Sequence, residues 1–186
     1  ADPGNAKRQL ELSLSLGTLG DMYWAKGGYP DALDKYQRAL VIADTLAAAD
    51  PTDAVRRYAL AHRHYFVGQT LRKMGDRDGA LASFGRSLAI NSELMAAEPK
   101  NPDYRQAAAV AYLKIGDVHF DAGDAATALS FHQKASEVLT SPPGETADVP
   151  VKRELALLLI RIAIHRRGQL DLGEAVASDL KAIAMQ

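Results

Sequence analysis

The chain has 186 residues, and 47% of them are hydrophobic, which is enough to form the core of an ordinary folded domain. Its 22 Lys and Arg against 23 Asp and Glu leave a formal net charge of -1, so the composition gives no global attraction to nucleic acid or to an anionic membrane. The absence of cysteine excludes disulfides, thiolate nucleophiles and cysteine-based zinc sites, and no apolar run reaches the roughly 18 to 20 residues of a membrane span.

The first segment, at about residues 4–50, predicts a helical hairpin. Its apolar residues follow a helical period on both sides of Gly27 and Gly28, where we expect the first helix to end and the chain to reverse. Gly20 lies in the middle of the first predicted helix, where glycine costs about 1 kcal/mol relative to alanine. We therefore expect a neighbouring helix to approach closely at Gly20.

Two further copies of this hairpin follow, at about residues 52–98 and 100–141. Several positions recur at intervals of 48 residues: Gly20, Gly68 and Gly116; Gly27, Gly75 and Gly123; Ala32, Ala80 and Ala128; Leu33, Leu81 and Leu129. The linkers recur at the same interval, as Ala1-Asp2-Pro3, Ala49-Asp50-Pro51 and Ala97-Glu98-Pro99. Agreement of four registers over three copies indicates an array of hairpins.

The last segment, at about residues 150–186, is a weaker copy in which Ala163 and Leu170 replace the two glycines. It predicts a degenerate hairpin that caps the C-terminal end of the array. The stretch Ser141-Pro142-Pro143-Gly144 cannot continue a helix, so residues 141–150 form either an ordinary loop or a hinge. The N-terminal edge has no polar cap helix, and we expect the array to have been cut from a longer protein.

The spacing within each copy resembles the tetratricopeptide (TPR) family, whose pattern is W-x2-L-G-x2-Y followed by A-x3-F. The first copy matches it at Leu16, Leu19, Gly20, Tyr23, Ala32, Tyr36 and Ala39. The period of 48 exceeds the family's usual 34 residues, which predicts longer helices. The resemblance implies an all-α, right-handed solenoid of about four hairpins in a single domain over residues 1–186. The long period and the Asp-Pro linkers also resemble arrays attached to bacterial signalling proteins, among them Ser/Thr kinases of the eukaryotic type. No residue of this chain itself indicates a kinase.

No pattern of titratable residues points to catalysis, a metal or a cofactor, and we expect a protein that is not an enzyme. His62 and His64 lie two residues apart and so on different faces of a helix, unlike the i, i+4 pair that chelates zinc. His119 and His132 occupy positions that hold other side chains of the packing pattern in the earlier copies, which favours a packing role. The phosphate-binding glycine motifs are absent from the sequence.

In such arrays the first helix of each hairpin lines a concave wall, and residues three to four apart share its exposed face. This rule selects Gly17, Asp21, Trp24, His62, Tyr65, Gln69, Arg72, Leu113, Asp117 and Phe120, with Ile160, Ile164 and Arg167 from the last copy. Trp24 follows the structural Tyr23 and is expected to point toward the concave side. Trp24, Tyr65 and Phe120 are either aromatic anchors for a partner or packing residues of the lengthened helices. Lys and Asn are missing from the positions that grip a C-terminal carboxylate in some family members.

We therefore expect a scaffold that binds a protein or peptide on its concave face, with no nucleic acid and no membrane insertion. The lack of cysteine fits a reducing compartment, so a cytoplasmic location is expected. Two alternatives stay open. The chain is a structural element that forms a homo-oligomer through its N-terminal edge, or it is a helical binder of a small ligand.

Overall fold

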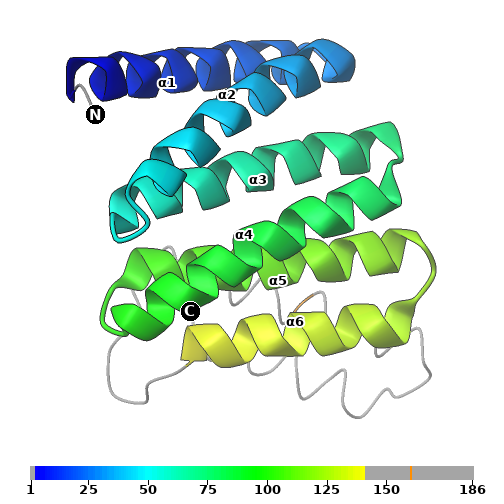
Figure 1. Cartoon of the computed structure of the whole chain (residues 1–186). Coiled ribbons are helices and arrows are strands. Elements are labelled where there is room, and N and C mark those ends of the chain that lie inside the picture. Colours follow the sequence, from blue (N-terminus) through cyan, green and yellow to red (C-terminus); the bar gives the residue numbers. More distant parts are fainter. Residues whose placement is uncertain (1–2, 141–159, 161–186) are drawn as a thin grey trace. The chain divides into compact units, whose positions relative to one another are not determined.

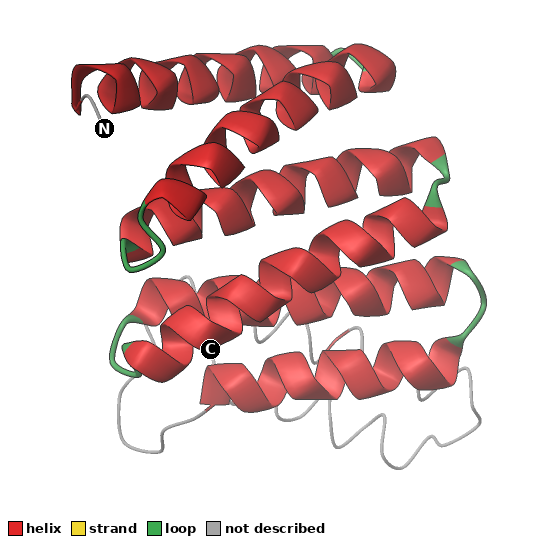
Figure 2. Ribbon diagram, viewed as in Figure 1, coloured by secondary structure: helices red, strands yellow, loops and turns green. Residues whose placement is uncertain are grey.

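The computed structural model describes residues 3–140 and residue 160, and every regular element in this part of the chain is a helix (Figures 1 and 2). The helices are α1 (Pro3–Ala25), α2 (Tyr29–Ala49), α3 (Ala54–Met74), α4 (Arg77–Ala97), α5 (Pro102–Asp121) and α6 (Ala125–Thr140). The chain divides into two compact units, residues 1–98 and 99–186. Helices α1 to α4 belong to the first unit and α5 and α6 to the second.

Among the described helices, α1 pairs with α2, α3 with α4 and α5 with α6, each pair forming a helical hairpin. Helices α1 to α5 have 20 to 23 residues each, which confirms that the long period lengthens the helices. The expected fourth hairpin, the 141–150 loop, Ile164 and Arg167 lie outside the described residues. The single domain over residues 1–186 stays a prediction.

A glycine in the middle of each first helix receives a ring from the second helix of the same hairpin. A Cβ atom added to these glycines would lie 2.5 to 2.9 Å from ring atoms, in the pairs Gly20 with Tyr36, Gly68 with Phe84 and Gly116 with His132. Each ring is buried. The expected close approach of a neighbouring helix is therefore confirmed, and its cause is an aromatic side chain 16 residues further along the chain.

The first helix of each hairpin ends at a glycine in the left-handed region, as expected. Gly27, Gly75 and Gly123 have φ values of 77°, 84° and 79°, a conformation that residues with a Cβ rarely adopt. The next helix then begins on an acidic cap in two of the hairpins. Asp76 accepts a hydrogen bond from the Gly79 N–H, and Asp124 accepts one from the Thr127 N–H.

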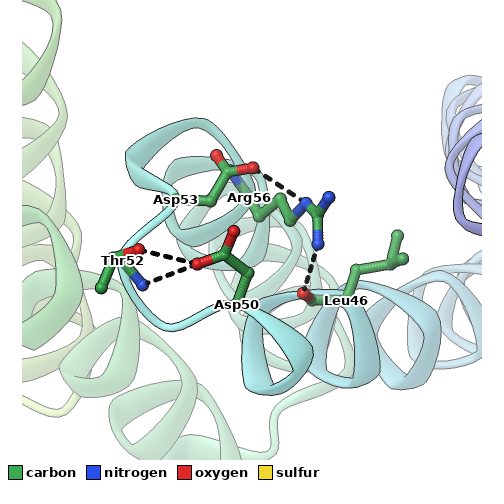
Figure 3. A network of polar contacts seen from close by, with 5 residues as sticks. All are labelled: Leu46, Asp50, Thr52, Asp53 and Arg56. Atoms are coloured by element: carbon green, nitrogen blue, oxygen red, sulfur yellow. Dashed lines mark hydrogen bonds and ion pairs between the residues drawn. The ribbon is translucent and has the colours of Figure 1, made fainter. Parts of the chain in front are cut away.

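The linker between α2 and α3 is held by a network of side chains (Figure 3). Asp50 accepts hydrogen bonds from the Thr52 hydroxyl at 2.8 Å and from the Thr52 N–H at 3.2 Å. Asp53 caps α3 by accepting from the Arg56 N–H at 3.0 Å, and it forms an ion pair with the Arg56 side chain at 2.9 Å. Arg56 also donates to the Leu46 carbonyl at 3.4 Å. The network joins the end of the first hairpin to the start of the second.

In the first unit, the second hairpin packs on α2 of the first. Ala32 and Tyr36 form a buried cluster with Val67 of α3, and the Tyr36 ring stacks on Phe66 with centroids 5.2 Å apart. The second unit has its own cluster between α5 and α6, made of Ala109, Leu113, Ala135 and Leu139.

Candidate binding face

Six of the predicted binding residues lie in the first unit, on the corresponding sides of α1 and α3. We call this set the binding face: Asp21, Trp24, His62, Tyr65, Gln69 and Arg72. The four residues on α3 are spaced at i, i+3, i+7 and i+10 and so share one side of that helix. The other three predicted residues, Leu113, Asp117 and Phe120, lie on α5 in the second unit.

Asp21 is exposed, yet its carboxylate is engaged with the hairpin interior. It accepts a hydrogen bond of 2.6 Å from the hydroxyl of Tyr36, whose ring is buried against Gly20. Burial raises the pKa of Tyr36 well above its ordinary value, and the bond to Asp21 raises it further. Tyr36 is therefore a neutral donor at all physiological pH values, and Asp21 ties α1 to α2.

Arg63 lies buried between α1 and α3, beside the binding face. Its guanidinium lies directly over Gly17, where a Cβ would overlap with Nη1. Burial lowers the pKa of Arg63, and the nearby Asp21 and Tyr36 act in the opposite direction. A guanidinium stays protonated in proteins, so a positive charge is enclosed close to the exposed Asp21.

His62, Tyr65 and Phe66 form a group of rings on α3. The His62 ring lies parallel to the Tyr65 ring, with centroids 6.3 Å apart, and edge-on to the Phe66 ring, with centroids 4.7 Å apart. The Tyr65 ring also lies near the Phe84 ring of α4, with centroids 6.1 Å apart. Burial lowers the pKa of His62 from its ordinary 6.5, Arg63 lowers it further, and Asp21 opposes both. His62 is therefore neutral at pH 7. Both His62 and Tyr65 keep part of their surface accessible.

Trp24 does not point wholly away from its hairpin. It is partly buried against the cluster of Ala32, Tyr36 and Val67, and its ring meets Tyr29 edge-on at 5.8 Å. The ring therefore helps to close the turn between α1 and α2 while part of it stays accessible. Gln69 and Arg72 are also partly exposed.

On α5, two of the three predicted residues are not exposed. Leu113 is buried in the cluster between α5 and α6, so its assignment to an open face is wrong. Asp117 is buried as well, because His132 reaches it from α6 with Nε2 3.4 Å from Oδ1, and Lys114 approaches its other oxygen at 3.7 Å. Phe120 is exposed.

His119 and His132 have the packing role expected of them. His119 stacks on Phe131 at 5.6 Å, with its Nδ1 3.5 Å from the Asp124 carboxylate, and His132 is fully buried over Gly116. Within residues 3–140 and 160, no group of three or more His, Asp or Glu side chains is arranged to hold a metal ion. No described helix is long and apolar enough to cross a membrane.

Comparison with known proteins agrees with this architecture. Residues 15–55, from the middle of α1 to the start of α3, match the sequence profile of the tetratricopeptide repeat. Residues 15–55 thus contain a tetratricopeptide-type repeat. A search of curated proteins gives no significant match to this chain.

Solved structures share the fold over nearly the whole chain. The apo form of RapI matches 95% of it with a TM-score of 0.72 at 15% identity, and BtubC (BKLC) from P. vanneervenii matches 94% with 0.69 at 16%. MamA matches 100% with a TM-score of 0.60 at 20% identity, over 80% of its own length. The chain spans 56% of RapI and 63% of BtubC, less than two thirds of either.

Sequence reasoning missed two features of the first unit. Arg63 occupies the position equivalent to Ser15, and nothing in its neighbours signals that it lies over Gly17. The second missed feature is the hydrogen bond from the Tyr36 hydroxyl to Asp21. The sequence analysis had placed Tyr36 in the packing pattern and Asp21 on the exposed face, so no contact between them was expected. A glycine at 17 was the available signal, because a second mid-helix glycine next to Gly20 indicates another close approach.

Proposed function

We propose that this chain is a non-catalytic scaffold whose binding face holds a protein or peptide partner. The observation that carries the proposal is the group of partly exposed rings, Trp24, His62 and Tyr65, whose positions are set by packing within the first unit. Aromatic side chains dominate the energetics of protein interfaces. Side chains that are already ordered lose little conformational entropy when a partner binds.

The charges around these rings favour a partner of mixed character. Asp21 is exposed on α1 and Arg72 is partly exposed near the end of α3, while His62 is neutral. This combination does not select a purely acidic or purely basic ligand. In the second unit, taken by itself, Phe120 is exposed on α5 and is proposed as a separate contact, whereas the buried Leu113 is not.

The proposal places the scaffold in the cytoplasm, as part of a longer signalling protein. The Asp-Pro linkers of the repeat and the absence of cysteine from the sequence support this assignment. In that setting the binding face would position another protein for the signalling domain.

The test is capture of a partner by the immobilised chain, followed by measurement of its affinity for variants. We expect Arg72→Glu and Tyr65→Ala each to weaken binding by about tenfold or more, the loss typical of central interface residues. Arg38→Glu on α2 is the matched control, because Arg38 is exposed and lies outside the binding face. Circular dichroism checks that each variant remains folded.

The proposal fails if the captured partner binds the Arg72 and Tyr65 variants as well as it binds the original chain. It also fails if Arg38→Glu weakens binding to the same extent, because the loss would then reflect net charge alone.

A further inference from the structure

The guanidinium of Arg63 is buried without a direct partner. Arg63 lies on α3 and is only 7% exposed, and its Nε is fully buried with no hydrogen-bond partner. Within the described part of the chain, no carboxylate lies within ion-pair distance of this guanidinium. A buried charge is costly unless it is paired and hydrogen-bonded. The first unit therefore encloses a positive charge that none of its described side chains neutralises by contact.

Asp21 supplies a negative charge nearby, but its carboxylate is held by another group. Its Oδ1 accepts the 2.6 Å hydrogen bond from the Tyr36 hydroxyl. Burial lowers the pKa of Arg63, and Asp21 opposes this effect. Asp21 thus acts on the guanidinium through space and not through a hydrogen bond. The N–H groups of Arg63 are left to donate to some other acceptor.

Gly17 makes room for this guanidinium on α1. A Cβ at position 17 would overlap with Nη1 of Arg63 and lie 3.1 Å from its Cζ, so a side chain there would displace the guanidinium. A glycine inside a helix also lowers helix propensity. The equivalents of Arg63 in the other copies are Ser15 and the buried Ala111, so the repeat itself does not require an arginine here. Two locally unfavourable residues that meet at one point are typical of a functional site.

The guanidinium adjoins the binding face. After burial, the charge of Arg63 is the main influence that lowers the pKa of His62, and His62 and Asp21 both belong to that face. Because Nε is fully buried, the terminal nitrogens are the atoms that a ligand can reach. Two guanidinium nitrogens match the two oxygens of a carboxylate. Since Asp21 partly offsets the charge of Arg63, a group with one negative charge suits this point better than a doubly charged phosphate.

We propose that Arg63 binds the carboxylate of an Asp or Glu side chain of the partner, inserted at Gly17 between α1 and α3. This inference rests on the proposed function, for which it names the anchoring group. The carboxylate pairs with the guanidinium and accepts the hydrogen bonds that the chain itself does not accept. A partner that lacks an acidic residue at this point leaves Arg63 buried and unpaired, so Arg63 contributes to specificity.

NMR of the isotope-labelled full chain tests the site with a defined probe. The probe is glutamate blocked as its N-acetyl N-methylamide, titrated at constant ionic strength and compared with the same derivative of glutamine. We expect the Nε–H resonance of Arg63, assigned with the variant Arg63→Lys, to shift saturably with blocked glutamate in the millimolar range. Blocked glutamine should cause no saturable shift. The Nε–H resonance of Arg38, exposed on α2, is the internal control and should not respond saturably to either compound.

The same titration can overturn the proposal. Equal shifts with both derivatives, or no saturable shift with either, would remove the carboxylate from the account. Inorganic phosphate that binds more tightly than blocked glutamate would assign the site to a free anion instead of a partner side chain. Binding of blocked glutamate by the variant Asp21→Asn alone would show that Asp21 already pairs with Arg63 in solution, which also contradicts the proposal.

The captured partner supplies the second measurement. Arg63→Met removes the charge but keeps a long side chain, and it should weaken partner binding by about tenfold or more. Its thermal midpoint should not fall, because an apolar replacement of a buried charge is often neutral or stabilising. Partner binding that depends on Tyr65 and Arg72 but not on Arg63 would overturn this inference and leave the proposed function intact. Partner binding that depends on none of these residues would overturn both.

Discussion

At the scale of single residues, the three mid-helix glycines have one physical role. Each makes room for a buried ring from the second helix, which is Tyr36, Phe84 or His132. The helix propensity lost at glycine is about 1 kcal/mol, and the close packing of the ring compensates for it. The glycine has this role in all three copies although the ring itself differs. The role is therefore set by the position in the repeat and not by the kind of ring.

The substitution Gly68→Ala should therefore destabilise the protein, although alanine is the better helix former. Its Cβ would lie 2.9 Å from the buried Phe84 ring, and overpacking of this kind costs about 1–3 kcal/mol. Gly85→Ala is the control, because Gly85 lies inside α4 with no atom within 4 Å of the added Cβ. Urea unfolding should show a lower midpoint for the first variant and an equal or higher midpoint for the second.

The histidines of α3 predict the pH dependence of stability. Burial lowers the pKa of both His62 and His64 from 6.5, helped by Arg63 and Arg86 respectively. The unfolded state therefore binds more protons than the folded state just below pH 6.5, and stability falls as the pH decreases through this range. The free energy of unfolding should be higher at pH 7.5 than at pH 5.5, and the double variant His62→Gln, His64→Gln should reduce that difference. An unchanged difference would contradict this assignment.

At the scale of helices, most of the fold was predictable from local signals. The positive-φ glycines, the caps at Asp76 and Asp124 and the helical period of apolar residues all act within one hairpin. Exposure was not predictable in the same way. Asp21 and Asp117 are equivalent in the repeat, yet the first is exposed and the second is buried beside His132, because the neighbouring side chains differ.

The start of α3 offers a test of the linker network. Asp53→Ala removes both the cap on the Arg56 N–H and the ion pair with its side chain, and should cost about 1 kcal/mol of stability. Asp53→Asn keeps a good capping side chain while removing the charge, so it should cost only a few tenths of a kcal/mol. If chemical unfolding shows equal losses for both variants, the ion pair rather than the cap stabilises this helix start.

At the scale of the whole molecule, the proposed function rests on the first unit, where the binding face combines partly exposed rings with both signs of charge. The family resemblance predicted a scaffold, but it could not show which of the candidate residues are exposed. Leu113 and Asp117 are buried on α5, and only the structure shows that.

The most direct test of the central claim is an NMR titration of the isotope-labelled chain with its captured partner. The account predicts that the largest shift changes fall on the binding face, at His62, Tyr65, Gln69 and Arg72. Changes confined to α2 or α4, with the α3 residues unaffected, would contradict it.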